Sequence, residues 1–130
     1  MSTRPPSIDA ELQKALTSDE PMSRKVPAAV RAYLEAARAH LAELHETVGS
    51  GRVVNEANSD LMDRLVRRLF ALAEEDHLSD GGRMERDLAV VAVGGYARRE
   101  MSIHSDVDLL ILYRDDMTPF VEFVAERLQY

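Results

Sequence analysis

An apolar run that ends in two glycines constrains this chain more than any other feature. Residues 88–93 read Leu-Ala-Val-Val-Ala-Val and lead directly into Gly94 and Gly95. A short run that is apolar at every position is typical of an interior β-strand, with neither face left to water. Glycines at a strand end let backbone N–H groups approach a ligand closely, because no Cβ stands in the way. The sequence therefore predicts an interior strand followed by a turn that can cradle phosphate groups.

Two aspartates at the start of a second apolar run complement the glycine turn. Ten residues separate Gly95 from Asp106, and Asp108 follows after one valine, within a predicted second strand over residues 107–113. Side chains at i and i+2 of a strand point to the same face, so Asp106 and Asp108 are expected to share a divalent cation. Without a cation, two like charges beside Leu and Ile would be unfavourable. A phosphate cradle beside a hard-metal site is what phosphoryl or nucleotidyl transfer requires.

The ten residues between the motifs supply further candidates for nucleotide binding. Residues 96–101 are expected to form a short helix or turn whose N-terminus faces the glycines and favours phosphate there. At least one of Arg98 and Arg99 is expected to pair with a triphosphate, the alternative being a surface ion pair with Glu100. Ser105 either contacts a phosphate or caps the turn before Asp106. For Tyr96, packing is favoured over stacking on a base.

The remaining pattern predicts an α+β chain with helices before and after the strands. Apolar residues recur at helical spacing over 26–48 and again over about 56–75, which predicts a packed helical pair. Residues 49–51 end the first helix, and Thr118 is expected to cap a last helix over 120–128. The expected organisation is a mobile segment (1–24) with a helical turn around 9–16, a helical region (25–86), and a strand–turn–strand–helix core (87–130).

Composition excludes several classes of function. The chain has 130 residues, a formal net charge of −7 and no cysteine. Without cysteine there is neither a disulfide framework nor a thiolate metal site. The acidic balance argues against nucleic-acid binding, which needs a basic surface. No apolar run approaches the length that crosses a bilayer, so no membrane association and a cytoplasmic location are expected.

The stretch 88–113 resembles the nucleotidyltransferase superfamily that includes DNA polymerase beta, and within it the PII uridylyltransferase/uridylyl-removing enzymes. Those enzymes usually read Gly-Gly-Tyr-Gly-Arg-x-Glu-Leu before Ser-Asp-Ile/Val-Asp-Leu-Leu. The resemblance implies Mg²⁺ held by Asp106 and Asp108, UTP as donor, and a tyrosine of the PII nitrogen-signalling protein as acceptor. It also favours Arg98 as the phosphate-binding arginine. Ala97 stands where the family usually has glycine, and it would be strained if that position needed a positive φ.

The resemblance further implies that the core over 87–130 is a truncated nucleotidyltransferase-like fold. Superfamily members generally add a third carboxylate from a later strand, and this sequence ends one predicted helix after Asp108. The chain is therefore expected to be the front part or a truncated relative of such an enzyme, with little activity alone. Two alternatives stay open: a stand-alone nucleotidyltransferase with another acceptor, and a catalytically inactive regulatory or interaction domain.

Overall fold

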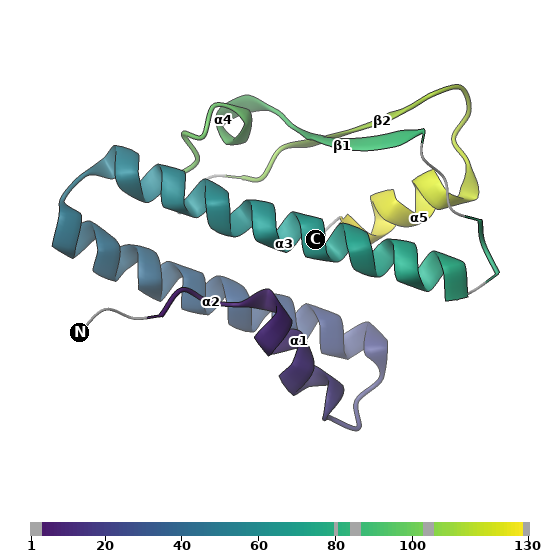
Figure 1. Cartoon of the computed structure of the whole chain (residues 1–130), viewed down its shortest axis with the longest axis horizontal. Helices are drawn as coiled ribbons and strands as arrows, with labels where there is room; N and C mark the ends of the chain where they lie inside the picture. Colours follow the sequence, from purple (N-terminus) through teal and green to yellow (C-terminus); the bar gives the residue numbers. More distant parts are fainter. Residues whose placement is uncertain (1–3, 80, 84–86, 103–105, 129–130) are drawn as a thin grey trace.

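The long helices of the chain form an antiparallel hairpin. The computed structural model describes residues 4–79, 81–83, 87–102 and 106–128. Helices α2 (Met22–Val48) and α3 (Gly51–Ser79) run in opposite directions, and α1 (Ile8–Leu16) packs against α2 (Figure 1). The predicted helical pair is therefore present. No helix in the described part of the chain is both long enough and apolar enough to cross a membrane.

The turn between α2 and α3 depends on one glycine. Gly49 caps α2 in the left-handed conformation (φ 67°), and its N–H donates to the carbonyl of His45 at 2.8 Å. A residue with a Cβ is strained in that conformation. Ser50 then accepts from the N–H of Val53 through its hydroxyl, so α3 begins at once at Gly51. The predicted end of the first helix is confirmed, whereas the second helix starts earlier than its expected start near residue 56.

The first 25 residues differ from the prediction. Helix α2 begins at Met22 rather than near Val26, because the carbonyl of Pro21 already accepts from the N–H groups of the residues three and four positions later. Pro27 therefore lies inside the helix and not in its first turn. The segment predicted to be mobile contains the nine-residue helix α1, which buries Ile8 and Leu12 in the core. Their i, i+4 spacing is enough to give this short helix an apolar side.

The helical core is formed mainly by apolar side chains of α2 and α3. Tyr33 is fully buried, and its hydroxyl donates to the carbonyl of Leu61 at 2.5 Å. Burial raises the pKa of Tyr33 to about 12. The predicted apolar residues of α2 point into this core, apart from Val48 at its end, which is exposed. On α3 the predicted face is divided, since Leu61, Leu65 and Leu69 join this core whereas Phe70 and Ala73 belong to a second cluster. The buried side chains of α2 and α3 in this cluster are Ala29, Val30, Tyr33, Ala37, Leu41, Val54, Leu61, Leu65 and Leu69.

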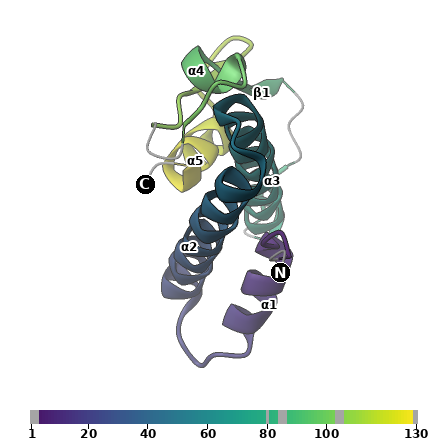
Figure 2. The same ribbon diagram turned by 90° about the vertical axis from the view of Figure 1, so that its left-hand side faces the viewer.

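A small sheet lies on the other side of α3. Strands β1 (Leu88–Ala92) and β2 (Leu109–Tyr113) pair antiparallel, with Val90 opposite Ile111, which confirms that the two apolar runs are neighbouring strands. Helix α5 (Pro119–Leu128) lies beside α3 under this sheet, so the molecule is layered as sheet, then α3 with α5, then α2 with α1 (Figure 2). As predicted, Thr118 caps α5, accepting from the N–H of Val121.

The outer face of the sheet is open to solvent. Ala89, Val91, Leu110 and Leu112 share this face by their register, and Leu110 and Leu112 are 46% and 50% exposed. The prediction that residues 88–93 form an interior strand covered on both faces is therefore wrong for the described part of the chain. Helices cover one face of the sheet, through Leu88, Val90 and the buried Phe120 and Val124, and the apolar pattern of the other face has no counterpart among the described residues.

Candidate functional site

The glycine turn begins where β1 ends. Helix α4 (Gly94–Ala97) is a single turn, preceded by Val93 in an extended conformation. Gly94 has a φ of 61°, in the left-handed region that favours glycine. A Cβ at Gly94 would also stand 3.2 Å from a carboxylate oxygen of Asp108, whereas a Cβ at Gly95 would meet nothing within 4 Å. Gly94 is thus required by the fold, while Gly95 is not.

The pairing of the two strands brings Asp108 to the glycine turn. The N–H of Val93 donates to the carbonyl of Asp108 at 3.1 Å, which extends the ladder one step beyond Ala92 and Leu109. The carboxylate of Asp108 consequently lies against Gly94. The glycine turn and the carboxylate of Asp108 therefore meet at one end of the sheet, although Gly94 and Asp108 are fourteen positions apart in the sequence.

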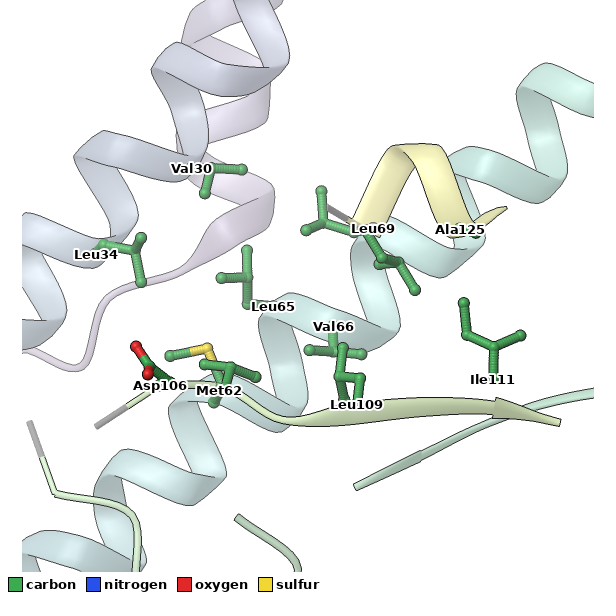
Figure 3. A pocket seen from close by; sticks show the side chains of 12 residues that line it. Val30, Leu34, Met62, Leu65, Val66, Leu69, Asp106, Leu109, Ile111 and Ala125 are labelled. Atoms are coloured by element: carbon green, nitrogen blue, oxygen red, sulfur yellow. The ribbon is translucent and has the colours of Figure 1, made fainter. Parts of the chain in front are cut away.

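Asp106 lies at the edge of a large apolar cavity. The cavity has a volume of about 830 Å³, between α2, α3, β2 and α5, and Asp106 alone among its lining residues is charged (Figure 3). Both Asp106 and Asp108 are exposed, so a cation could reach either carboxylate. The apolar side chains that line the cavity are Val30, Leu34, Met62, Leu65, Val66, Leu69, Val107, Leu109, Ile111, Ala125 and Leu128.

A complete set of metal ligands is not found within residues 4–79, 81–83, 87–102 and 106–128. No group of three or more His, Cys, Asp or Glu side chains there could hold a metal ion. Asp106 and Asp108 supply two carboxylates, and Ser105, a predicted phosphate contact, lies outside the described residues. Oxygen ligands are what Mg²⁺ prefers, and in proteins it keeps several waters and takes one or two carboxylates together with substrate phosphates. The donor chemistry of this pair therefore fits Mg²⁺.

The two arginines after α4 point to different partners. Arg98 Nε donates to Glu100 at 3.1 Å, and both side chains are largely exposed. An exposed ion pair of this kind contributes at most about 1 kcal/mol, so a triphosphate could displace Glu100 from Arg98. Arg99 instead turns toward α3, where its guanidinium contacts the carboxylates of Asp60 and Asp63. Its positive φ of 59° is the only such angle at a non-glycine residue in the described part of the chain.

Ala97 is unstrained in this turn. It lies inside α4, and the left-handed conformations fall at Gly94 and Arg99. An alanine is well suited to a helical position. The backbone strain that was expected at Ala97 if this position needed a positive φ is therefore absent.

Several residues of α3 contact the segment after the glycine turn, and the sequence did not predict these contacts. Tyr96 is buried, as the favoured packing role requires, and its hydroxyl donates to Asp63 at 2.6 Å. Burial, followed by the hydrogen bond and the negative charge of Asp63, raises the pKa of Tyr96. The amide of Asn58 donates to the carbonyls of Met101 and Ser102, at 3.0 Å each. The acidic row on α3 consists of Glu56, Asp60 and Asp63. Their spacing of four and three residues places them on one side of the helix, and this spacing is the sequence feature that could have indicated these contacts.

Comparison with known proteins identifies a family for most of the chain. Residues 29–129 match the family described as "Putative nucleotidyltransferase DUF294". Two relatives are named bifunctional uridylyltransferase/uridylyl-removing enzyme. The protein of Rhodospirillum rubrum is 42% identical over 86 residues, covering 65% of this chain and 9% of the relative. That of Cereibacter sphaeroides is 40% identical over 130 residues, covering 95% and 14%.

A third relative extends the comparison to another bacterial group. The Streptomyces coelicolor enzyme of the same name is 40% identical over 96 residues, covering 72% of this chain and 10% of the relative. The chain thus spans between 9% and 14% of the length of these three relatives. No solved structure matches the chain.

Proposed function

The chain belongs to the DUF294 nucleotidyltransferase family, and we propose that its β1–α4–β2 unit binds a nucleoside triphosphate with Mg²⁺ for nucleotidyl transfer. The observation that carries the proposal is the contact between the glycine turn and Asp108. A glycine with φ 61° stands where a Cβ would approach the Asp108 carboxylate to 3.2 Å. A turn free of side chains beside an exposed carboxylate suits a phosphate group and a cation that bind together.

Each residue of the unit has a distinct proposed task. Asp106 and Asp108 hold Mg²⁺, which when bound polarises the α-phosphate and lowers the pKa of the attacking hydroxyl. The open side of Gly95 admits the phosphate chain, because nothing in the fold occupies the space of its missing side chain. Arg98 exchanges its exposed pairing with Glu100 for the triphosphate. The proposal gives Ser105 a phosphate contact on the strength of the sequence alone.

The proposed donor is UTP, and the proposed acceptor is a tyrosine hydroxyl of the PII signal protein. The support is that the three relatives above carry the name uridylyltransferase at 40% identity or more. In this reaction the tyrosine oxygen bonds to the α-phosphorus of UTP, the bond from that phosphorus to the bridging oxygen breaks, and pyrophosphate leaves. The tyrosine proton passes to solvent. We further propose that the protein acts in the cytoplasm, where this donor and this acceptor meet.

The test is transfer of label from UTP, labelled at the α-phosphate, to purified PII by the protein as its gene encodes it. We expect Mg²⁺-dependent labelling of PII, and its loss in Asp106→Asn and Asp108→Asn. Losing one ligand of the cation removes several kcal/mol of transition-state stabilisation, so the rate should fall by a factor of about a thousand or more. Asp19→Asn, a change of the same charge between α1 and α2, is the matched control and should leave the rate unchanged.

Other nucleotides and acceptors decide among the alternatives. Transfer from UTP to a protein other than PII would keep the nucleotidyltransferase and replace the acceptor. Undiminished labelling of PII in Asp106→Asn would refute the role assigned to that carboxylate. Absence of any transfer and of any Mg²⁺-dependent nucleotide binding would overturn the proposal in favour of an inactive interaction domain.

A further inference from the structure

Residues 96–102, which follow the glycine turn, are tied to α3 near both of their ends. At the start of this segment, Tyr96 donates to Asp63 Oδ1 at 2.6 Å, and Arg99 Nη1 donates to Asp63 Oδ2 at 3.2 Å. Near its end, Asn58 donates to the carbonyls of Met101 and Ser102. Residues 96–102 therefore cannot shift along α3 without losing hydrogen bonds at both places.

The contacts at Asp63 are unusual because both of its oxygens are used. One oxygen accepts from a buried phenol, and the other accepts from a guanidinium that also contacts Asp60 and the carbonyl of Glu56. Hydrogen bonds to a charged partner are stronger than those between neutral groups. The hydrogen bond to Asp63, first, and the charge of Asp60 raise the pKa of Arg99. Asp63 thus joins two residues of the turn, three positions apart, through one carboxylate.

The backbone of Arg99 has a left-handed conformation that its surroundings hold. A non-glycine residue in the left-handed region is unfavourable, and such residues persist where the surroundings over-determine them. At Arg99 the backbone N–H of the next residue, Glu100, donates to the carbonyl of Gly95 at 2.9 Å and closes the turn. The guanidinium of Arg99 contacts the carboxylates of Asp63 and Asp60 and the carbonyl of Glu56 on α3. Arg99, in the left-handed conformation, lies just after α4. Two residues later, Met101 is buried, with 1% of its surface exposed. Asp63 and the backbone hydrogen bond from Glu100 to Gly95 therefore fix the path of the chain directly after α4.

We infer that Asp63 is a positioning residue of the nucleotide site: through Tyr96 and Arg99 it fixes the orientation of α4, and with it the close approach of Gly94 to Asp108. Asp63 itself touches neither nucleotide nor cation. This inference rests on the proposed function, because the orientation of α4 matters only if the turn binds phosphates. It assigns a share in catalysis to α3, which apolar periodicity predicts only as one member of a packed helical pair.

The test compares five variants with the native protein as its gene encodes it. Transfer of UMP is measured well below the temperature of unfolding. Partners that orient a ligand-binding group typically contribute 10-fold to 100-fold, so Asp63→Ala should lower kcat/KM for UTP by about that factor. Tyr96→Phe should give a smaller loss. The double variant should be no worse than Asp63→Ala, because both changes remove the same contact. KM for PII should stay unchanged in all of them.

Asp60→Asn is the matched control on the same helix. It removes an exposed partner of Arg99 but leaves Asp63 with both of its hydrogen bonds, so kcat/KM should change by less than about twofold. Asp63→Asn keeps an oxygen that can accept from Tyr96 and loses the charge that holds Arg99. Its kcat/KM should fall between those of Asp63→Ala and the native protein.

The outcomes separate this inference from the proposed function. Native transfer with unchanged kcat/KM in Asp63→Ala would overturn the positioning role and leave the proposed function standing. A lowered melting temperature with unchanged kcat/KM would have the same meaning, since it shows a contribution to folding alone. Absence of transfer by the native protein would overturn the proposed function, and the inference with it.

Discussion

The helical region and the small sheet bury their apolar side chains to different extents. Between α2 and α3, Leu41 and Leu65 are almost completely buried, and the buried hydroxyl of Tyr33 has its hydrogen-bond acceptor. On the sheet, Leu110 and Leu112 are about half exposed, and the carboxylates of Asp106 and Asp108 face solvent. The helical region thus buries its apolar side chains among its own elements, whereas apolar and charged groups at the sheet are exposed to solvent.

This difference indicates where the chain meets other molecules. Within the described residues every buried side-chain nitrogen or oxygen has a hydrogen-bond partner, so the fold leaves no polar group unsatisfied inside. Exposed apolar surface and paired like charges are unfavourable in an isolated molecule and are typical of binding sites. Function is therefore expected at the sheet and its glycine turn, and stability in the helical pair.

Truncation of the helical core should have the largest effect on stability. Leu41 is 1% exposed between α2 and α3, and Leu41→Ala should lower the free energy of unfolding by about 2–5 kcal/mol. Urea unfolding followed by circular dichroism measures the change. A loss below 1 kcal/mol would mean that the helical pair is not the stable region, and the contrast with the sheet would fail.

The two glycines of the turn should respond differently to alanine. Gly94→Ala places a Cβ in the left-handed region and against Asp108, so it should cost roughly 1–2 kcal/mol of stability. Gly95→Ala meets open space without a positive φ, so stability should be unchanged while the new methyl group hinders phosphate approach. Thermal unfolding and Mg²⁺-dependent UTP binding, measured on both variants, provide the comparison. Equal stability of the two would contradict the geometry of the turn, and full UTP affinity in Gly95→Ala would contradict its proposed task.

The stability of the protein at alkaline pH should depend on the ionisation of Tyr33 in the helical core. Burial raises the pKa of Tyr33 from 10.0 to about 12, so between these values the folded protein retains a proton that the unfolded chain loses. Stability is therefore fully present below pH 10 and decreases as the pH rises toward 12, by up to about 1.4 kcal/mol per pH unit. Tyr96, whose pKa is also raised, contributes in the same direction.

The variant Tyr33→Phe isolates that contribution. It should lose about 1 kcal/mol at neutral pH, because the hydrogen bond to Leu61 is removed, and show a shallower decline between pH 10 and 11 than the native protein. Denaturant unfolding at pH 7, 10 and 11 measures both. An identical decline in the two proteins would show that Tyr33 ionises as freely in the folded state as in the unfolded chain.

The outer face of the sheet should give the smallest effect. Leu112 is 50% exposed, so Leu112→Ala should change stability by no more than about 0.5 kcal/mol. Urea unfolding at several protein concentrations is the measurement. A loss of 2 kcal/mol or more would show that this face is covered in solution, and the difference between the two regions would then disappear.

Much of the fold follows from local pattern, and the departures have physical causes. The helical pair, the cap at Thr118 and the pairing of the two apolar runs depend on periodicity and turn chemistry, which sequence carries directly. The packing of α1 depends on tertiary contacts. The early start of α2 depends on local hydrogen bonds to the carbonyl of Pro21, which apolar periodicity does not mark. The open sheet face was wrongly predicted to be buried, since an apolar run specifies what a strand could bury and not whether a partner covers it.

The candidate site was predictable in its motifs but not in its supports. The order of glycines and aspartates gave the turn and the carboxylates, and strand pairing brings Asp108 to Gly94. The sequence did not show which of the adjacent residues Arg98 and Arg99 contacts α3. Sequence resemblance favoured Arg98 as the phosphate-binding arginine, whereas Arg99 is the one that contacts α3, and Asp63 lies 36 residues before it. Contacts at that separation follow from the packing of α4 on α3, which local pattern does not encode.

Binding of UTP with and without Mg²⁺ is the most direct test of a nucleotide–metal site at this turn. In the protein as its gene encodes it, UTP at a hundred times its Kd should stabilise the folded state by about 2.7 kcal/mol when Mg²⁺ is present, and not when EDTA replaces it. Asp108→Asn should abolish this stabilisation without lowering the melting temperature of the unliganded protein, because removing one of two like charges relieves repulsion. Equal stabilisation by UTP in native protein and Asp108→Asn, or in Mg²⁺ and EDTA, would contradict the account.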